Sequence, residues 1–170
     1  MRTKRLLLAR GVVIGLCWML QACSTAPRAP SAASTADNET PSEWQGRLSV
    51  QVQSEPPTSM SAGFLLRGNA QDGELDLYSP LGNTLGALQW SPHSARLSQG
   101  GSSQYFASIA ELTEKITGAA LPINAIFQWL QGVNASAVGW RADLSSASEG
   151  LVTARRTQPQ PEVSLRIKLD

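Results

Sequence analysis

The sequence contains few of the residues on which enzyme chemistry commonly depends. Only two cysteines, Cys17 and Cys23, and one histidine, His93, occur among the 170 residues. Both cysteines lie near the amino terminus, so the rest of the chain has no thiolate and no disulfide. A single histidine excludes metal sites that need several histidine ligands. The composition therefore predicts neither a bound metal nor a cofactor.

Charged and aromatic residues are also sparse. Charged residues make up 16% of the chain and aromatic residues 6%, and the formal net charge is +1. This near-neutral balance gives no electrostatic basis for binding nucleic acid. The hydrophobic fraction of 42% is sufficient for a folded core, and the length suits one domain or at most two.

Known catalytic motifs are missing as well. His93 lies in a turn-like Ser-Pro-His-Ser string, and the chain contains no G-x-S-x-G nucleophile elbow. No lysine of a phosphate-binding loop follows the glycine pair, so we expect residues 100–103 to connect a strand to a helix. We predict that the chain is not an enzyme, and a hydrolase with His93 as its base is the weakest alternative.

The amino terminus resembles a targeting signal. Four basic residues within residues 1–10 precede an apolar stretch at 11–20, and about 20 apolar residues are needed to span a bilayer. The stretch ends in Leu-Gln-Ala-Cys23, which resembles the lipobox of bacterial lipoproteins. We interpret residues 1–22 as a lipoprotein signal peptide and Cys23 as the lipidated new terminus. An ordinary secretory signal with an incidental cysteine is the alternative.

The next segment lacks the pattern of a folded element. Residues 24–42 are dominated by Pro, Ala, Ser and Thr without apolar periodicity, so we expect residues 23–43 to be a lipidated terminus and flexible tether. Loss of residues 1–22 removes four of the 14 basic residues, which leaves ten against 13 acidic residues and a formal charge of −3. By resemblance to enterobacterial sorting, Ser24 favours the outer membrane.

Residues 44–170 form the predicted folded domain. Apolar and polar residues alternate in eight segments, the pattern of half-buried strands, and turn residues separate them. The expected strands are 47–52, 60–66, 74–78, 85–90, 95–97, 140–144, 151–155 and 163–169. Their close spacing favours an antiparallel sheet over parallel βαβ units.

The middle of the domain has helical spacing instead. Ser108 and Glu111 form a capping box ahead of a helix that we expect to end at Gly118. Pro122 suits the first position of a second helix, whose apolar stripe is Ile123, Ile126, Phe127 and Leu130 and whose end is Gly132. We therefore predict a mainly β, α+β fold in which helices cover one face of the sheet. The pattern alone favours a filled core and leaves a ligand cavity as the alternative.

Several strings in this order resemble the LolB family of outer-membrane lipoprotein receptors. They are Gly-Arg-Leu-Ser-Val at 46–50, Tyr-Ser-Pro-Leu-Gly-Asn-Thr at 78–84, Leu-Pro-Ile at 121–123 and Trp-Leu-Gln-Gly at 129–132. The resemblance covers most of residues 44–170. It implies a half-open antiparallel β-barrel with a helical lid over an apolar cavity.

The resemblance also implies a function. Such a receptor accepts cargo lipoproteins from a soluble periplasmic carrier, LolA, and inserts them into the outer membrane without using nucleotide. We therefore expect a monomer on the periplasmic face of the outer membrane, anchored through Cys23, whose partners are the carrier, the cargo and membrane phospholipid. The alternative is an envelope scaffold or binding lipoprotein with a filled core and no lipid cavity.

Residue roles follow from the same resemblance and from the spacing. Pro80, Leu81 and Gly82 match the family's membrane-insertion loop, and a leucine folded back onto the core is the alternative. Acyl-chain pocket candidates, for which ordinary core is the alternative, are Phe64, Leu66, Leu77, Leu88, Trp90, Ile126, Phe127, Trp129, Leu130 and Trp140. From charge alone, contributors to a carrier-docking surface are Arg141, Arg155, Arg156 and Arg166.

Overall fold

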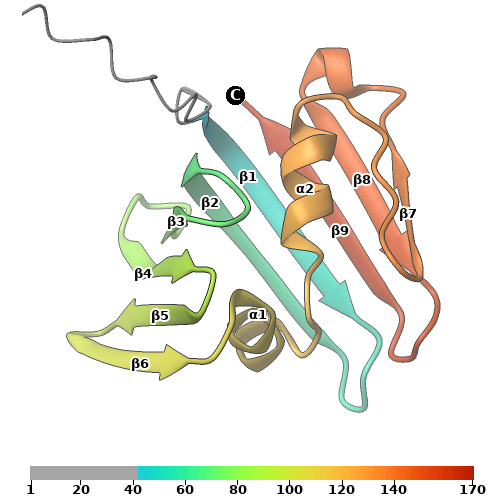
Figure 1. Cartoon of the computed structure of the whole chain (residues 1–170). Helices are drawn as coiled ribbons and strands as arrows, with labels where there is room; N and C mark the ends of the chain where they lie inside the picture. The colour runs from blue at the N-terminus through green and yellow to red at the C-terminus, as the bar shows by residue number, and fades with distance from the viewer. Residues whose placement is uncertain (1–41) are drawn as a thin grey trace, which may run out of the picture. The chain divides into compact units, whose positions relative to one another are not determined.

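The computed structural model describes residues 42–170, which form one antiparallel sheet and two helices (Figure 1). The predicted signal peptide, Cys23 and nearly all of the tether lie outside the described residues. The strands are β1 Ser42–Val52, β2 Thr58–Gly68, β3 Gly73–Tyr78, β4 Thr84–Ser91, β5 Ser94–Gln99, β6 Ser102–Phe106, β7 Trp140–Asp143, β8 Leu151–Arg156 and β9 Val163–Leu169. The helices are α1 Ile109–Thr117 and α2 Ile123–Leu130, and a short 3₁₀ turn spans Ala147–Glu149.

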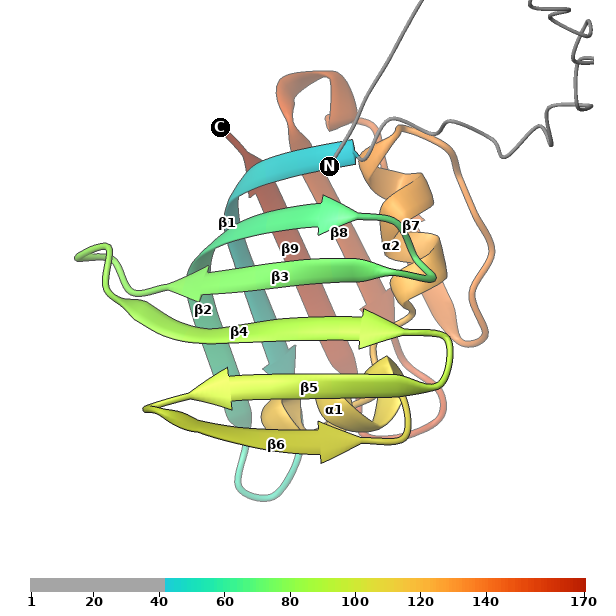
Figure 2. The ribbon, with the colours of Figure 1, turned by 60° about the vertical axis from the view of Figure 1, so that its left-hand side comes forward.

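The strand order within the described chain is β6-β5-β4-β3-β2-β1-β9-β8-β7. Because β6 and β7 remain unpaired on their outer sides, the sheet is open, as expected for a half-open barrel. Figure 2 shows β3 to β6 crossing in front of β1, β9 and β8, so the sheet curves back over itself. The predicted mainly β fold with helices on one face is confirmed.

Strict alternation along the strands defines the inner face. In β1, β2 and β9 the buried residues recur at every second position, among them Val50, Phe64 and Leu165. The antiparallel register brings these positions side by side, because Val50 pairs with Met60 on one side and with Leu165 on the other. One face of the sheet is therefore a continuous apolar surface, and the outer face carries the polar residues.

The two helices begin and end largely where the sequence indicates. Ser108 Oγ accepts a hydrogen bond from the Glu111 amide at 3.2 Å, and the Glu111 carboxylate accepts one from the Ala107 amide at 2.9 Å. This capping box starts α1, and Gly118 ends it in a left-handed conformation. Pro122 is the N-cap of α2 and not its first helical residue, so the helix begins at Ile123, one residue later than predicted. Among residues 42–170, neither helix has the length and hydropathy needed to cross a membrane.

One expectation about the strands was wrong. Residues 102–106 form β6 and pair with β5, whereas we expected residues 100–103 to connect a strand to a helix. The segment has no alternating apolar residues because it is an edge strand, and four of its five residues are exposed. β1 also begins at Ser42, two residues before the expected domain boundary.

The two faces of β4 provide a test of this alternation. Leu88 is 1% exposed on the inner face, and Leu85 is 41% exposed and points outward. We expect Leu88→Ala to lower the free energy of unfolding by about 2–5 kcal/mol, because it leaves a cavity in packed surroundings. Leu85→Ala is the matched control, with an expected loss of less than about 1 kcal/mol. Urea unfolding of both variants measures the difference, and equal losses would contradict the assigned faces.

Candidate functional site

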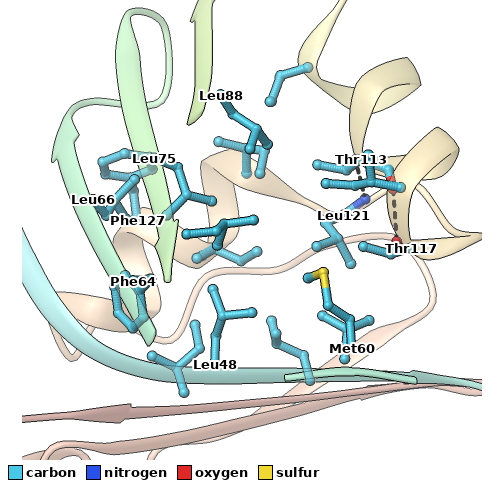
Figure 3. Close-up of a pocket in the computed structure, with 18 of the residues that line it drawn as sticks. Leu48, Met60, Phe64, Leu66, Leu75, Leu88, Thr113, Thr117, Leu121 and Phe127 are labelled. Atoms are coloured by element: carbon cyan, nitrogen blue, oxygen red, sulfur yellow. Dashed lines mark hydrogen bonds between the residues drawn. The ribbon is translucent and has the colours of Figure 1, made fainter. Parts of the chain in front are cut away.

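An apolar cavity lies between the inner face of the sheet and the two helices (Figure 3). Its free volume is about 70 Å³. The residues that line it come from strands on both walls of the sheet and from both helices. They are Leu48, Val50, Met60, Phe64, Leu66, Leu75, Leu77, Leu88, Trp90, Ile109, Thr113, Ile116, Thr117, Leu121, Ile123, Ile126, Phe127, Leu130, Leu165 and Ile167.

Most of the predicted pocket residues meet at this cavity. The structure brings together eight of the ten candidates: Phe64, Leu66, Leu77, Leu88, Trp90, Ile126, Phe127 and Leu130. Strand alternation places the first five on the inner face, and helical spacing places the last three on the side of α2 that faces the sheet. Trp129 and Trp140 are not part of the lining.

The two tryptophans pack against each other outside the cavity. Trp129 is 1% exposed, and its indole N–H donates to the carbonyl of Ala135 at 2.9 Å. Its ring centroid lies 6.3 Å from that of Trp140, whose ring lies 5.9 Å from the Arg156 guanidinium carbon. Neither tryptophan therefore lines the cavity. They fix the segment after α2 against the end of the sheet.

Sequence reasoning missed twelve residues of the lining. These residues are Leu48, Val50, Met60, Leu75, Ile109, Thr113, Ile116, Thr117, Leu121, Ile123, Leu165 and Ile167. Leu48, Met60 and Leu75 occupy alternating positions of the expected strands, and Ile109 and Ile116 have helical spacing in the first expected helix, so the sequence held a signal for these five residues. What the pattern did not indicate is that α1 covers the same cavity as α2.

The few polar groups of the lining are mostly satisfied locally. The Thr113 hydroxyl donates to Ala110 O at 2.9 Å and accepts from the Leu121 amide at 3.1 Å, and the Thr117 hydroxyl donates to Thr113 O at 2.8 Å (Figure 3). Trp90 Nε1 is the one buried side-chain donor of this lining without a partner. None of the lining residues is ionisable. The cavity therefore suits an uncharged, apolar ligand and offers no acid–base chemistry.

Apolar contacts alone hold the helices over the cavity. Within residues 42–170, no side-chain hydrogen bond or ion pair joins α1 or α2 to the sheet. The Phe127 ring of α2 meets Trp44 edge-on at 5.5 Å and Trp90 at 6.3 Å between centroids. Burial of apolar surface is itself non-directional, so a shift of the helices relative to the sheet would break no side-chain hydrogen bond or ion pair between them.

A second candidate feature is the turn between β3 and β4. Leu81 at its tip is 88% exposed, so it does not fold back onto the core. The Ser79 amide donates to Asn83 O at 2.8 Å, and the Gly82 amide donates to Ser79 O at 2.9 Å. Gly82 has a φ of 81°, a conformation that a β-carbon disfavours. This closed turn presents a single large apolar side chain to the surroundings.

The candidate enzyme residues do not assemble into a site. His93 is exposed at the turn between β4 and β5. In the part of the chain that the structure describes, no three His, Cys, Asp or Glu side chains group as metal ligands do.

The fold and the cavity define a class of protein in which an open antiparallel sheet curves around an apolar cavity beneath two helices. Comparison with known sequences identifies the family within that class. The model of the family "Outer membrane lipoprotein LolB" matches residues 41–164, well over half of the chain. The chain belongs to the LolB family.

Individual relatives agree with this result. The Outer-membrane lipoprotein LolB of Bordetella petrii is 26% identical over 176 residues, which cover 90% of this chain and 87% of the relative. The protein of that name from Cupriavidus taiwanensis is 31% identical, covering 77% of this chain and 64% of the relative. One from a Shewanella species is 31% identical over 66% of this chain, and the match spans about half of that relative. The chain is thus an outer-membrane lipoprotein of this family.

The cavity can be tested with a fluorescent fatty acid. We expect the probe to bind, and Leu75→Glu to weaken binding at least about tenfold, because the new carboxylate lies in an apolar lining. Leu85→Glu places the same group on the outer face and is the control. Circular dichroism checks that both variants fold, and Met60→Gln is a milder substitution in the same lining. A filled core predicts no probe binding by the unsubstituted chain.

Proposed function

We propose that this chain accepts lipoproteins from a soluble periplasmic carrier and inserts them into the outer membrane. The acyl chains of the cargo occupy the cavity beneath α1 and α2, and no nucleotide is used. The observation that carries the proposal is the uncharged, apolar lining in a chain of the LolB family. In the same proposal, residues 1–22 are a signal peptide and lipid on Cys23 anchors the chain.

The physical need for such a cavity follows from the cargo. Each methylene of an acyl chain exposed to water costs about 0.8 kcal/mol, so a lipidated terminus cannot cross an aqueous compartment uncovered. A carrier and a receptor with successively more favourable apolar sites move the chains in one direction. A difference of about 1.4 kcal/mol between two sites biases the equilibrium tenfold.

The cavity has to widen when it is occupied. Its free volume of about 70 Å³ is far below the roughly 300–1,000 Å³ of typical ligand pockets. Because the helices contact the sheet through apolar side chains, an acyl chain can replace those contacts with similar ones. The Trp90 N–H, which lacks a partner, is available to a carbonyl oxygen at the head of an acyl chain.

Release into the membrane is the role that we assign to the β3–β4 turn. The exposed leucine forfeits burial worth about 1.5–3 kcal/mol, which it recovers when it enters the apolar part of a bilayer. The closed hydrogen-bonded turn holds Leu81 away from the cavity lining, so binding of cargo and contact with membrane use separate residues.

The test of the proposal is a transfer assay. The mature chain with Cys23→Ala, so that it carries no lipid, is mixed with a carrier that is loaded with a lipoprotein. We expect the lipoprotein to pass to this chain without ATP, as followed by co-purification. A folded chain that accepts no lipoprotein would favour the alternative, an envelope scaffold with a filled core.

Leu81 has a matched control elsewhere on the surface. Leu81→Glu should leave folding and lipoprotein acceptance unchanged and reduce delivery to phospholipid vesicles at least about tenfold, because a carboxylate does not enter the bilayer interior. The control is Val138→Glu, which introduces the same carboxylate at a residue that is 91% exposed in the segment between α2 and β7. Delivery is measured as lipoprotein that sediments with vesicles. Normal delivery by Leu81→Glu would remove the role given to this residue.

A further inference from the structure

Charged residues are distributed unevenly over the outer face of the sheet. Arg67 on β2 lies within 3.5 Å of three carboxylates, those of Glu43, Glu74 and Asp76. The hydrogen bond to Glu43, together with these negative charges, raises the pKa of Arg67 above its ordinary value. This part of the outer face, over the starts of β1 and β3, therefore offers no free positive charge.

The opposite part of that face carries four cations, here called the outer-face cations: Arg47 on β1, Arg141 on β7, and Arg166 and Lys168 on β9. The register places Arg47 beside Lys168, and Thr153 of β8 lies opposite Arg166. All four are exposed, and none forms an ion pair with a carboxylate of residues 42–170.

Other charged groups lie in the same region, and the exposed Asp170, which follows β9, lines the same hollow as Arg47. Arg155 forms an ion pair with Glu162. Asp143 accepts a hydrogen bond from the Ser145 amide at 3.0 Å, and this contact lowers the pKa of its carboxyl group. The Lys168 ammonium, one of the outer-face cations, donates to the backbone carbonyl of Glu149. Arg156 points to the inner side beside Trp140, so it does not belong to this surface, contrary to the expected docking set.

The outer-face cations adjoin the base of the β3–β4 turn. Arg47, Gly63 and Tyr78 are consecutive partners across β1, β2 and β3. Because Gly63 has no side chain, a hollow opens there, and it is lined by Arg47 together with Ser79, Pro80 and Gly82 of the turn. Figure 2 shows the turn extending beyond the ends of β3 and β4, on the side away from α2. The β3–β4 turn, with Leu81 at its tip, and the outer-face cations thus belong to one continuous surface.

We propose that the outer-face cations bind the headgroups of an anionic phospholipid bilayer and so orient the turn for insertion of Leu81. The inference deepens the proposed function and depends on it for the role of Leu81. Residues 42–170 contain nine basic and eleven acidic residues, a formal charge of −2, so the domain as a whole is not drawn to an anionic membrane. Attraction arises only when this surface faces the bilayer, which selects one orientation.

The composition of the surface favours lipid over a protein partner. Protein interfaces are enriched in aromatic residues and depleted in lysine at their centres. The outward positions of β7, β8, β9 and β1 hold no aromatic residue within the described strands, and five of their thirteen residues carry long cationic side chains. Flexible cations around one apolar tip match a bilayer, whose charge is at the surface and whose interior is apolar.

The experiment compares two double variants with the same change in charge. The mature chain with Cys23→Ala is sedimented with zwitterionic vesicles and with vesicles that contain about 30% phosphatidylglycerol. The test variant is Arg47→Gln with Arg166→Gln, and the control is Arg96→Gln with Lys115→Gln, which lie on β5 and α1. Thermal unfolding establishes that both are folded.

We expect the unsubstituted chain to prefer the anionic vesicles. Each cation at a membrane surface contributes about fivefold, so the test variant should lose about 10- to 25-fold of this partition and the control less than about twofold. Salt at about 1 M, which shortens the screening length to about 3 Å, should abolish the preference. The proposal would be overturned if the unsubstituted chain partitioned equally to both vesicle types, or if both double variants lost the same amount of partition to anionic vesicles.

Two further results separate this inference from the proposed function and from a protein partner. Acceptance of lipoprotein from the carrier, measured without vesicles, should be unchanged in the test variant. If the test variant keeps its vesicle partition but loses the carrier, the surface is a protein interface and the inference is wrong. If the unsubstituted chain prefers anionic vesicles but accepts no lipoprotein, the proposed receptor function fails and the binding of anionic lipid by the outer-face cations stands.

Discussion

Coverage of the inner face of the sheet is the constraint on which the rest of the structure depends. The inner positions of all the described strands except β6 form an apolar surface, and within residues 42–170 two helices of nine and eight residues are available to cover it. The sheet meets part of this need by curving until β3 to β6 face β1, β9 and β8 (Figure 2). Curvature and short helices together leave residual space at the centre, so the cavity is a consequence of how this fold buries its apolar residues.

The same constraint explains why the cavity lining and the packed core share residues. Phe64, Leu88 and Phe127 are among the buried side chains and also line the cavity. In the proposed function, an apolar ligand would therefore compete with the helices for one surface and would not occupy a separate preformed site. The polar interactions that hold the structure together, such as the ion pairs of Arg67 and the cap at Ser108, lie outside this surface and are unaffected when it changes occupant.

Sequence periodicity predicted the elements that have one buried face and failed for those that do not. β1, β2 and β9 alternate and were recognised, whereas β6 is exposed on both faces at the edge of the sheet and carries no such pattern. The pocket shows the same limit. Spacing located the inward side of α2, but Trp129 is also bound by the segment that follows the helix, where its indole N–H donates to Ala135 O. Helical periodicity does not predict how that segment folds back onto the helix. Trp140 faces inward on β7, too far along the sheet to reach the cavity.

The closed geometry of the β3–β4 turn has a consequence for kinetics. Two backbone hydrogen bonds and the left-handed Gly82 fix the turn, so Leu81 is held extended before it meets any partner. A flexible loop would lose backbone entropy of about 1–2 kcal/mol per residue ordered at the moment of contact. Here that ordering has been completed during folding, so in the insertion role proposed for the turn, little of the barrier would remain in the loop itself. The frequency of the proposed insertion would then be governed by how often the domain meets the bilayer in a suitable orientation, with the leucine already in place at each encounter.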